Sequence, residues 1–177
     1  MPFAYYDRLS VRDQGVYRRS DAVTAVELPH PDRLHALVGG LREALAADER
    51  RAVERAAGQL AEGLLRMLGL APVVVEVLAV RPSSRWGELH GLYTRDGRRP
   101  PHIQLWMRTA RHRRVVAFRT FLRTLLHEVG HHLDYEHLKM AESFHTEGFF
   151  RRESSLFKQL VPPEAPHDPE EPPPGRK

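Results

Sequence analysis

The chain has 177 residues and a formal net charge of +4, and this length is sufficient for one domain with a real hydrophobic core. It contains no cysteine, which excludes a disulfide framework, a cysteine-based zinc knuckle and a thiol nucleophile. The first residues lack a signal-peptide pattern and no apolar run approaches the roughly 20 residues of a membrane span, so we expect a soluble cytoplasmic protein with no membrane partner.

A helical layer is predicted for residues 1–72. Ser10 is a suitable N-cap, and Asp13 stands at the capping-box position, so a short helix is expected over residues 11–19. Leu28-Pro29-His30-Pro31 is expected to form the loop that follows. This layer is predicted to pack on the rest of the protein.

Two longer helices are expected after this loop. Asp32 is predicted to cap the first, in which the pair Gly39-Gly40 is a candidate break or bend. Asp48 is predicted to cap the second, and Gly69 to end it as a C-cap. Pro72 then prevents the helix from continuing.

Three strands are predicted next. Residues 73–80 are β-branched and nearly continuously apolar, which indicates a strand buried on both faces. A second strand is expected over Glu88 to Thr94, followed by a turn at Asp96-Gly97, and a third over His102 to Met107. The expected fold class is α+β with a small, mainly antiparallel three-stranded sheet.

A helix with a candidate zinc motif follows between residues 114 and 135. Its apolar positions recur at spacings of three and four: Val115, Phe118, Leu122, Leu125, Val129 and Leu133. His127, Glu128 and His131 form an H-E-x-x-H motif, in which the two histidines lie on one helix face. Two such imidazoles can bind Zn²⁺ while Glu128 acts as general base on a metal-bound water. Gly130 indicates a close approach of another element beside the metal.

A catalytic zinc site usually has three protein ligands, so a third must be found. Asp134 is about 10.5 Å along the helix from His127, which is too far to share the ion. The remaining candidates are His137, Glu142, His145, Glu147 and Glu153. We favour His145, at the start of a last helix predicted over Thr146 to Leu160, with Glu153 as the alternative. His132 competes with His131 as a ligand but is expected to lie behind the site or on the surface.

These motifs together resemble the SprT-like minimal zincins over roughly residues 73–160. The matching segments are Thr124-Leu125-Leu126-His127-Glu128-Val129-Gly130-His131, Trp86-Gly87…Gly91, Ile103-Gln104-Leu105 and His145-Thr146-Glu147-Gly148-Phe149. The resemblance implies a zincin core, zinc on His127, His131 and His145, and Glu128 as general base. Thr146 departs from the family, which commonly has glycine after the third histidine.

The sequence thus predicts a helical N-terminal region over residues 1–72, a zincin core over 73–161 and a disordered, proline-rich acidic tail over 162–177. The predicted function is a zinc-dependent metallopeptidase acting on peptides or proteins. The strand around Ile103–Met107 is expected to bind an extended substrate at a sheet edge. Tyr93, His132 and the nearby arginines are all candidate oxyanion donors.

Two alternative functions remain open. One is a zincin-like zinc-binding protein without protease activity, in which the metal is structural. The other is a nucleic-acid-associated protease that uses the basic stretch 81–123. This stretch contains eleven arginines and only two acidic residues, Glu88 and Asp96, which gives it a net charge of +9.

Overall fold

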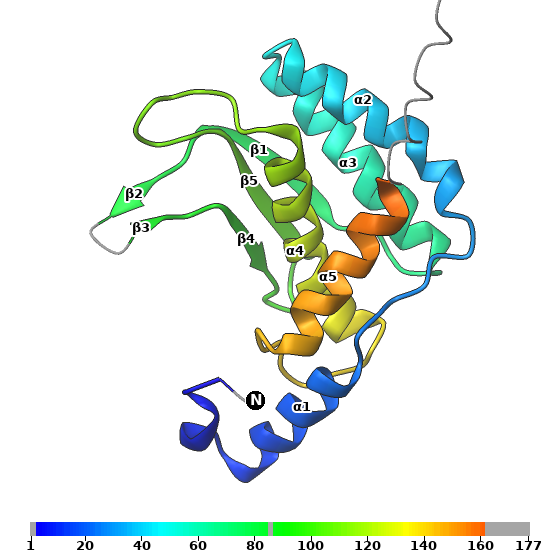
Figure 1. Cartoon of the computed structure of the whole chain (residues 1–177), viewed down its shortest axis with the longest axis vertical. Helices are drawn as coiled ribbons and strands as arrows, with labels where there is room; N and C mark the ends of the chain where they lie inside the picture. Colours follow the sequence, from blue (N-terminus) through cyan, green and yellow to red (C-terminus); the bar gives the residue numbers. More distant parts are fainter. Residues whose placement is uncertain (1–2, 85–86, 162–177) are drawn as a thin grey trace, which may run out of the picture.

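The computed structural model of this chain describes residues 3–84 and 87–161. Within them the fold is α+β, as predicted, with five α-helices and a small mixed sheet (Figure 1). The α-helices are α1 (Val11–Ala22), α2 (His35–Ala46), α3 (Arg50–Met67), α4 (Phe118–Glu136) and α5 (Glu147–Leu160). The strands are β1 (Val74–Val80), β2 (Ser83–Ser84), β3 (Gly87–Glu88), β4 (Gly91–Thr94) and β5 (His102–Arg108).

The three-stranded sheet has the order β1-β5-β4, with β5 in the centre. β5 is parallel to β1 and antiparallel to β4, so the prediction of a mainly antiparallel sheet is wrong for one of the two pairs. The chain leaves β1 through the small β2–β3 hairpin, returns along β4 and reverses into β5. β5 therefore runs in the same direction as β1. The second predicted strand, Glu88 to Thr94, is divided between β3 and β4.

β1 is not buried on both faces, contrary to the prediction. Val77 is fully buried, but Val74 is half exposed, and Glu76 bonds to Gln104 of β5 at 2.8 Å on a partly exposed face. β1 is an edge strand, and the helices pack against the opposite face, where Ile103 of β5 joins the hydrophobic core. The β-branched residues of 73–80 correctly predicted a strand, but they did not show that one of its faces is exposed.

The helix caps follow the prediction only in part. Ser10 Oγ accepts a hydrogen bond from the Asp13 N–H at 3.1 Å, as expected. A 3-10 turn over Pro31–Leu34 precedes α2, so Asp32 does not cap this helix. Asp48 does not cap α3 either, because its backbone has a positive φ of 57° and its carboxylate pairs with Arg108. α2 continues without a break through Gly39-Gly40, and Gly69 ends α3 with a φ of 70°.

One hydrophobic core joins α2 and α3 to the sheet, α4 and α5. The boundary that the sequence suggests at residue 72 therefore does not separate two cores, and the division into regions stays a prediction. Trp86 and the predicted tail 162–177 lie outside the described residues. Among the helices that the structure describes, none is both long and apolar enough to cross a membrane.

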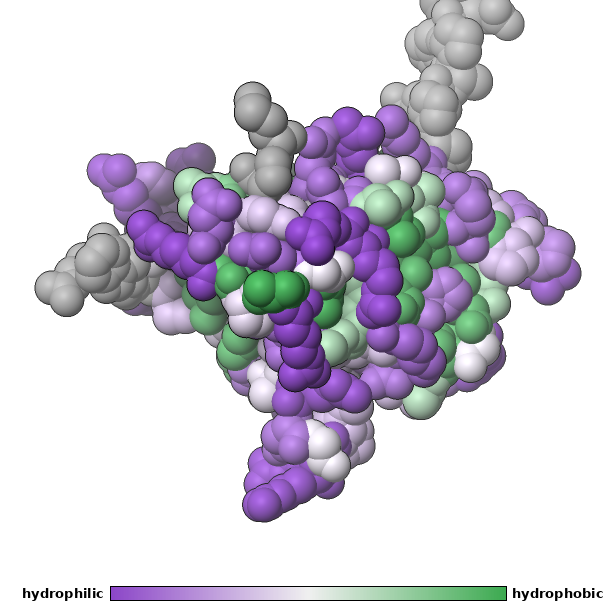
Figure 2. Space-filling view, turned by 90° about the horizontal axis from the view of Figure 1, so that it is seen from below, coloured by the Kyte–Doolittle hydropathy of each residue, from purple (hydrophilic) through white to green (hydrophobic). Residues whose placement is uncertain are grey.

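Helix α1 lies apart from this core and packs on the first turn of α5 (Figure 1). Gly148 allows the close contact, because a Cβ there would lie 2.5 Å from the Ser20 carbonyl oxygen. The Gly148 N–H also donates to Asp21 Oδ1 at 3.0 Å. Seen from this end, the surface is mostly hydrophilic, with hydrophobic areas between the polar side chains (Figure 2).

Candidate metal centre

The H-E-x-x-H motif lies in the middle of α4. The helix buries Leu122, Leu125, Val129 and Leu133 in the core, which fixes the direction of its other face. His127 and His131, one turn apart, are partly exposed on that face.

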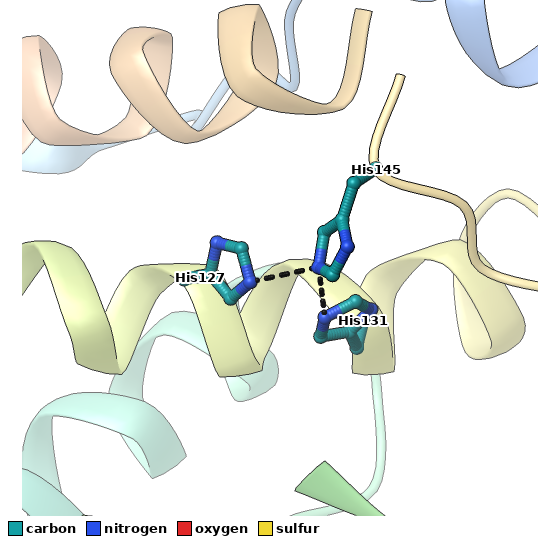
Figure 3. Close-up of side chains that lie close together, drawn as sticks. All are labelled: His127, His131 and His145. Atoms are coloured by element: carbon teal, nitrogen blue, oxygen red, sulfur yellow. Dashed lines mark hydrogen bonds between the residues drawn. The ribbon is translucent and has the colours of Figure 1, made fainter. Parts of the chain in front are cut away.

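His145 completes a cluster of three imidazoles. It precedes Thr146, the N-cap of α5, and its side chain points back towards α4 (Figure 3). His145 Nε2 lies 3.0 Å from His127 Nε2 and 3.1 Å from His131 Nε2. A tetrahedral zinc with Zn–N bonds of about 2.0–2.1 Å separates its ligand nitrogens by roughly 3.3 Å. Without large movement, the three nitrogens can therefore bind one such ion.

The tautomer of His131 is fixed by a hydrogen-bonded chain behind it. Ser143 Oγ donates to Asp134 Oδ2 at 2.7 Å, and so it can only accept from His131 Nδ1, also at 2.7 Å. Arg152 Nη2 donates to the other oxygen of Asp134 at 2.7 Å. His131 therefore carries its proton on Nδ1 and presents the Nε2 lone pair to the site.

His127 is oriented in a similar way by Glu153. Its Nδ1 lies 3.2 Å from Glu153 Oε2, a carboxylate oxygen that can only accept, so Nε2 is left free for a metal. Glu153 also pairs with Arg123, with Nη1 and Oε1 3.4 Å apart. The alternative third ligand thus lies behind His127 rather than beside His145.

The other candidate ligands do not join the cluster. Among the described residues, the ligand atoms that lie together belong to His127, His131 and His145. Burial lowers the pKa of His131 to about 3, and the neighbouring histidines add to the effect. Burial likewise lowers the pKa of His145. Both imidazoles are therefore neutral near pH 7, which is the form that binds metal.

Phe149 packs beneath all three imidazoles. Its ring centroid lies 5.0 Å from that of His127, 4.8 Å from that of His131 and 5.3 Å from that of His145. A Cβ at Gly130 would lie 3.1 Å from this ring, so Gly130 does provide the close approach that its place in the motif indicated. The Phe149 N–H donates to Thr146 Oγ1 at 2.9 Å, which ties the ring to the start of α5.

Glu128 is buried beside the imidazoles and against β4. Burial raises its pKa to about 7, although His127 and the Tyr93 backbone N–H act in the opposite direction. Two cavities of about 290 Å³ each meet at Glu128 and Gly91. The Cβ of any larger residue at Gly91 would collide with Glu128 Oε1 and lie 2.8 Å from Thr124 Cγ2. A Cβ at this position would have to displace the Glu128 carboxylate or the Thr124 methyl group.

Tyr93 and His132 have different roles among the candidate oxyanion donors. Tyr93 lines the cavity that contains His131 and His145, whereas His132 is buried at 2 % exposure and does not line it. Tyr93 Oη lies 3.1 Å from His132 Nδ1, and the Tyr93 ring stacks on that of His131 with centroids 6.3 Å apart. Burial raises the pKa of Tyr93 to about 12, so its phenol keeps the proton. His132 orients this phenol rather than binding a metal.

Sequence reasoning missed the residues that hold the centre in place. Asp134 was rejected as a ligand, but its spacing of three from His131 on the same helix does indicate a neighbour on that face. Ser143 and Arg152 gave no local signal. Tyr5 was also missed; its hydroxyl donates to the His145 carbonyl oxygen at 3.2 Å across 140 residues.

The basic stretch 81–123 is less cationic than its composition indicates. In the described part of the chain, four of its arginines form ion pairs, three of them with acids outside the stretch. These pairs are Arg81–Glu88, Arg95–Glu136, Arg108–Asp48 and Arg123–Glu153. The nucleic-acid alternative stays a hypothesis, with fewer unpaired cations to support it.

No protein-family model, no curated protein and no solved structure matches this chain. The resemblance to SprT-like zincins therefore stays a hypothesis, and any function must be argued from the chemistry of the site itself.

Proposed function

We propose that this protein is a zinc-dependent metallopeptidase of the zincin type. The observation that carries the proposal is the convergence of three Nε2 atoms, those of His127, His131 and His145, beside the buried carboxylate of Glu128. Neutral imidazoles are typical zinc ligands. Three protein ligands, with no fourth in the cluster among the described residues, are typical of catalytic rather than structural zinc sites.

The residues around the site fit hydrolysis of a peptide bond. When bound, zinc supplies a Lewis acid and a water whose pKa is lowered towards 7. Glu128 would accept a proton from a water held at the site and pass it to the leaving amine. Its buried position and raised pKa suit this transfer. Tyr93, protonated and on the cavity wall, is the candidate donor to the carbonyl oxygen as negative charge develops.

The substrate would bind along β4. We expected the strand around Ile103–Met107 to provide the edge, but β5 is central and both of its sides are paired. β4 ends the sheet, and within the described residues no other strand pairs with its outer side. Gly91 and Leu92 of β4 line the cavity at Glu128. An extended peptide that pairs with this edge would lie along the cavity that β4 shares with the three histidines.

The test measures zinc content and hydrolysis together. Purified wild-type protein should bind about one zinc per chain and cleave a quenched fluorescent peptide library or casein. Glu128→Gln should keep the zinc and lose hydrolysis, because the base forms no bond to the metal. If the zinc-loaded wild type cleaves none of these substrates, the alternative of a non-enzymatic zinc-binding protein is preferred.

A further inference from the structure

A larger cavity, distinct from the two that meet at Glu128, lies beside the metal centre. It has a volume of about 750 Å³ and is enclosed by α2, α4 and α5. Its floor is apolar and buried, with Val38, Phe157 and Leu160. Its basic residues are His35, Arg42, Arg119, Arg123 and Lys158. Among the residues that the structure describes, neither Asp nor Glu lines this cavity, which we call the cationic groove.

The arginines of the cationic groove are held in place by aromatic rings. The guanidinium carbons of Arg119 and Arg123 lie 4.8 and 4.2 Å from the Phe157 ring centroid, and that of Arg42 lies 4.6 Å from the Phe118 centroid. Stacking covers the guanidinium faces and leaves their N–H edges free to donate. In the described part of the chain, only Arg123 of the basic residues in the groove has an acidic partner.

The cationic groove adjoins the candidate active site at Arg123. This residue lines both the groove and the cavity that contains His127 and Glu128. Along α4, Arg123 is about 6 Å from His127, and Arg119 about 12 Å. An extended peptide advances about 3.3 Å per residue. Side chains roughly two to four residues from the scissile bond would therefore reach these two arginines.

We propose that the cationic groove binds acidic side chains of a polypeptide substrate, on one side of the scissile bond. The inference rests on the proposed function and specifies its substrate class. Guanidinium groups bind carboxylates through paired N–H donors, and the apolar floor can accept the stems of the same side chains. A nucleic acid fits less well, because guanidiniums already cover one face of Phe157 and of Phe118, which removes the platform that base stacking uses.

Binding can be tested without hydrolysis in the full chain with Glu128→Gln, loaded with zinc. Fluorescence anisotropy would compare three labelled peptides: one with Glu two and four positions before a central Phe-Leu pair, one with Glu at the same spacings after it, and one with Gln at all of these positions. One acidic peptide should bind at least about tenfold more tightly than the Gln peptide, a difference of about 1.4 kcal/mol. This preference should weaken as sodium chloride is raised.

Variants then locate the contact. The preference for the acidic peptide should fall in the double variant Arg119→Gln/Lys158→Gln and, separately, in Arg42→Gln. The control is the double variant Arg51→Gln/Arg55→Gln on α3, which removes two positive charges outside the groove and should leave the preference unchanged. Equal binding of all three peptides would overturn the proposal, as would equal losses in the α3 control. Tighter binding of single-stranded DNA through the same arginines would also overturn it. If the preference holds but the wild type cleaves none of the peptides, the groove is supported and the peptidase function fails.

Discussion

The hydroxyl group of Ser143 lies 2.7 Å from Nδ1 of His131 and can only accept the imidazole proton, because its own proton goes to Asp134. A neutral, partly buried hydroxyl therefore stands between a fully buried carboxylate and a candidate metal ligand. Asp134 and Arg152 are connected to His131 through this hydroxyl.

The first prediction concerns this contact. Ser143→Ala should weaken zinc affinity by about 10–100-fold, because His131 loses the acceptor that fixes its tautomer. Competition with a chelating dye measures the change. Ser154→Ala is the matched control on α5, since Ser154 is partly exposed and outside the cluster. Equal zinc affinities in wild type and Ser143→Ala would show that the hydrogen bond to Ser143 does not orient His131.

The second prediction concerns Gly91. Gly91→Ala should lower stability by about 1–3 kcal/mol, because the new Cβ collides with the carboxylate of Glu128. The displaced carboxylate should also abolish any hydrolysis while zinc stays bound. Thermal unfolding and a zinc assay give both results. Gly39→Ala serves as control, because a Cβ there meets nothing within 4 Å in the middle of α2. A Gly91→Ala protein as stable and active as wild type would contradict the packing of Glu128 on β4.

The third prediction concerns Arg152, which joins α1 to the metal centre. Its Nη1 donates to the Ser20 carbonyl oxygen at 2.6 Å, and its Nη2 donates to Asp134. Both members of the ion pair are buried, at 3 % and 0 % exposure. Arg152→Met should cost about 3–5 kcal/mol of unfolding free energy, because it leaves a buried carboxylate without its partner.

Chemical denaturation tests this value against two controls. Arg151→Ala breaks an exposed ion pair with Glu147 and should cost at most about 1 kcal/mol. Arg152→Met combined with Asp134→Asn should recover part of the loss, since the uncompensated charge is gone. A similar small cost for Arg151→Ala and Arg152→Met would mean that the buried pair does not stabilise the fold.

Local patterns in the sequence predicted the elements that carry the site. The apolar period of three and four placed H-E-x-x-H on one face of a helix, and the structure has α4 there. The place of His145 at the start of the last predicted helix favours it as third ligand, and the structure brings its imidazole to the other two. Both inferences depend on helix geometry and on short chain distances, which a sequence shows directly.

Non-local contacts were not predictable in the same way. The direction of β1 relative to β5 depends on how the β2–β3 hairpin turns, and no residue in either strand encodes it. For the same reason, the substrate edge was assigned to β5 rather than β4. The hydrogen bond from Tyr5 to His145 and that from Arg152 to Ser20 join residues more than 100 positions apart, so no periodicity reports them.

The last prediction separates the two candidate third ligands. His145→Ala should weaken zinc affinity by more than about 100-fold, because the ion loses one of its three protein ligands. Glu153→Leu removes only the acceptor behind His127 Nδ1 and should cost about 10–100-fold. Glu153→Gln keeps a carbonyl oxygen as acceptor and should cost less than Glu153→Leu.

The order of the three variants is more informative than any single value. Zinc affinity measured under one set of conditions should fall in the order Glu153→Gln, Glu153→Leu, His145→Ala. Replacing a ligand with alanine removes its bond to the metal. Replacing an orienting residue with one that keeps the hydrogen bond, such as Glu153→Gln, should preserve part of the zinc affinity. If Glu153→Leu releases the metal and His145→Ala retains it, the carboxylate is the third ligand and the three-histidine site is wrong.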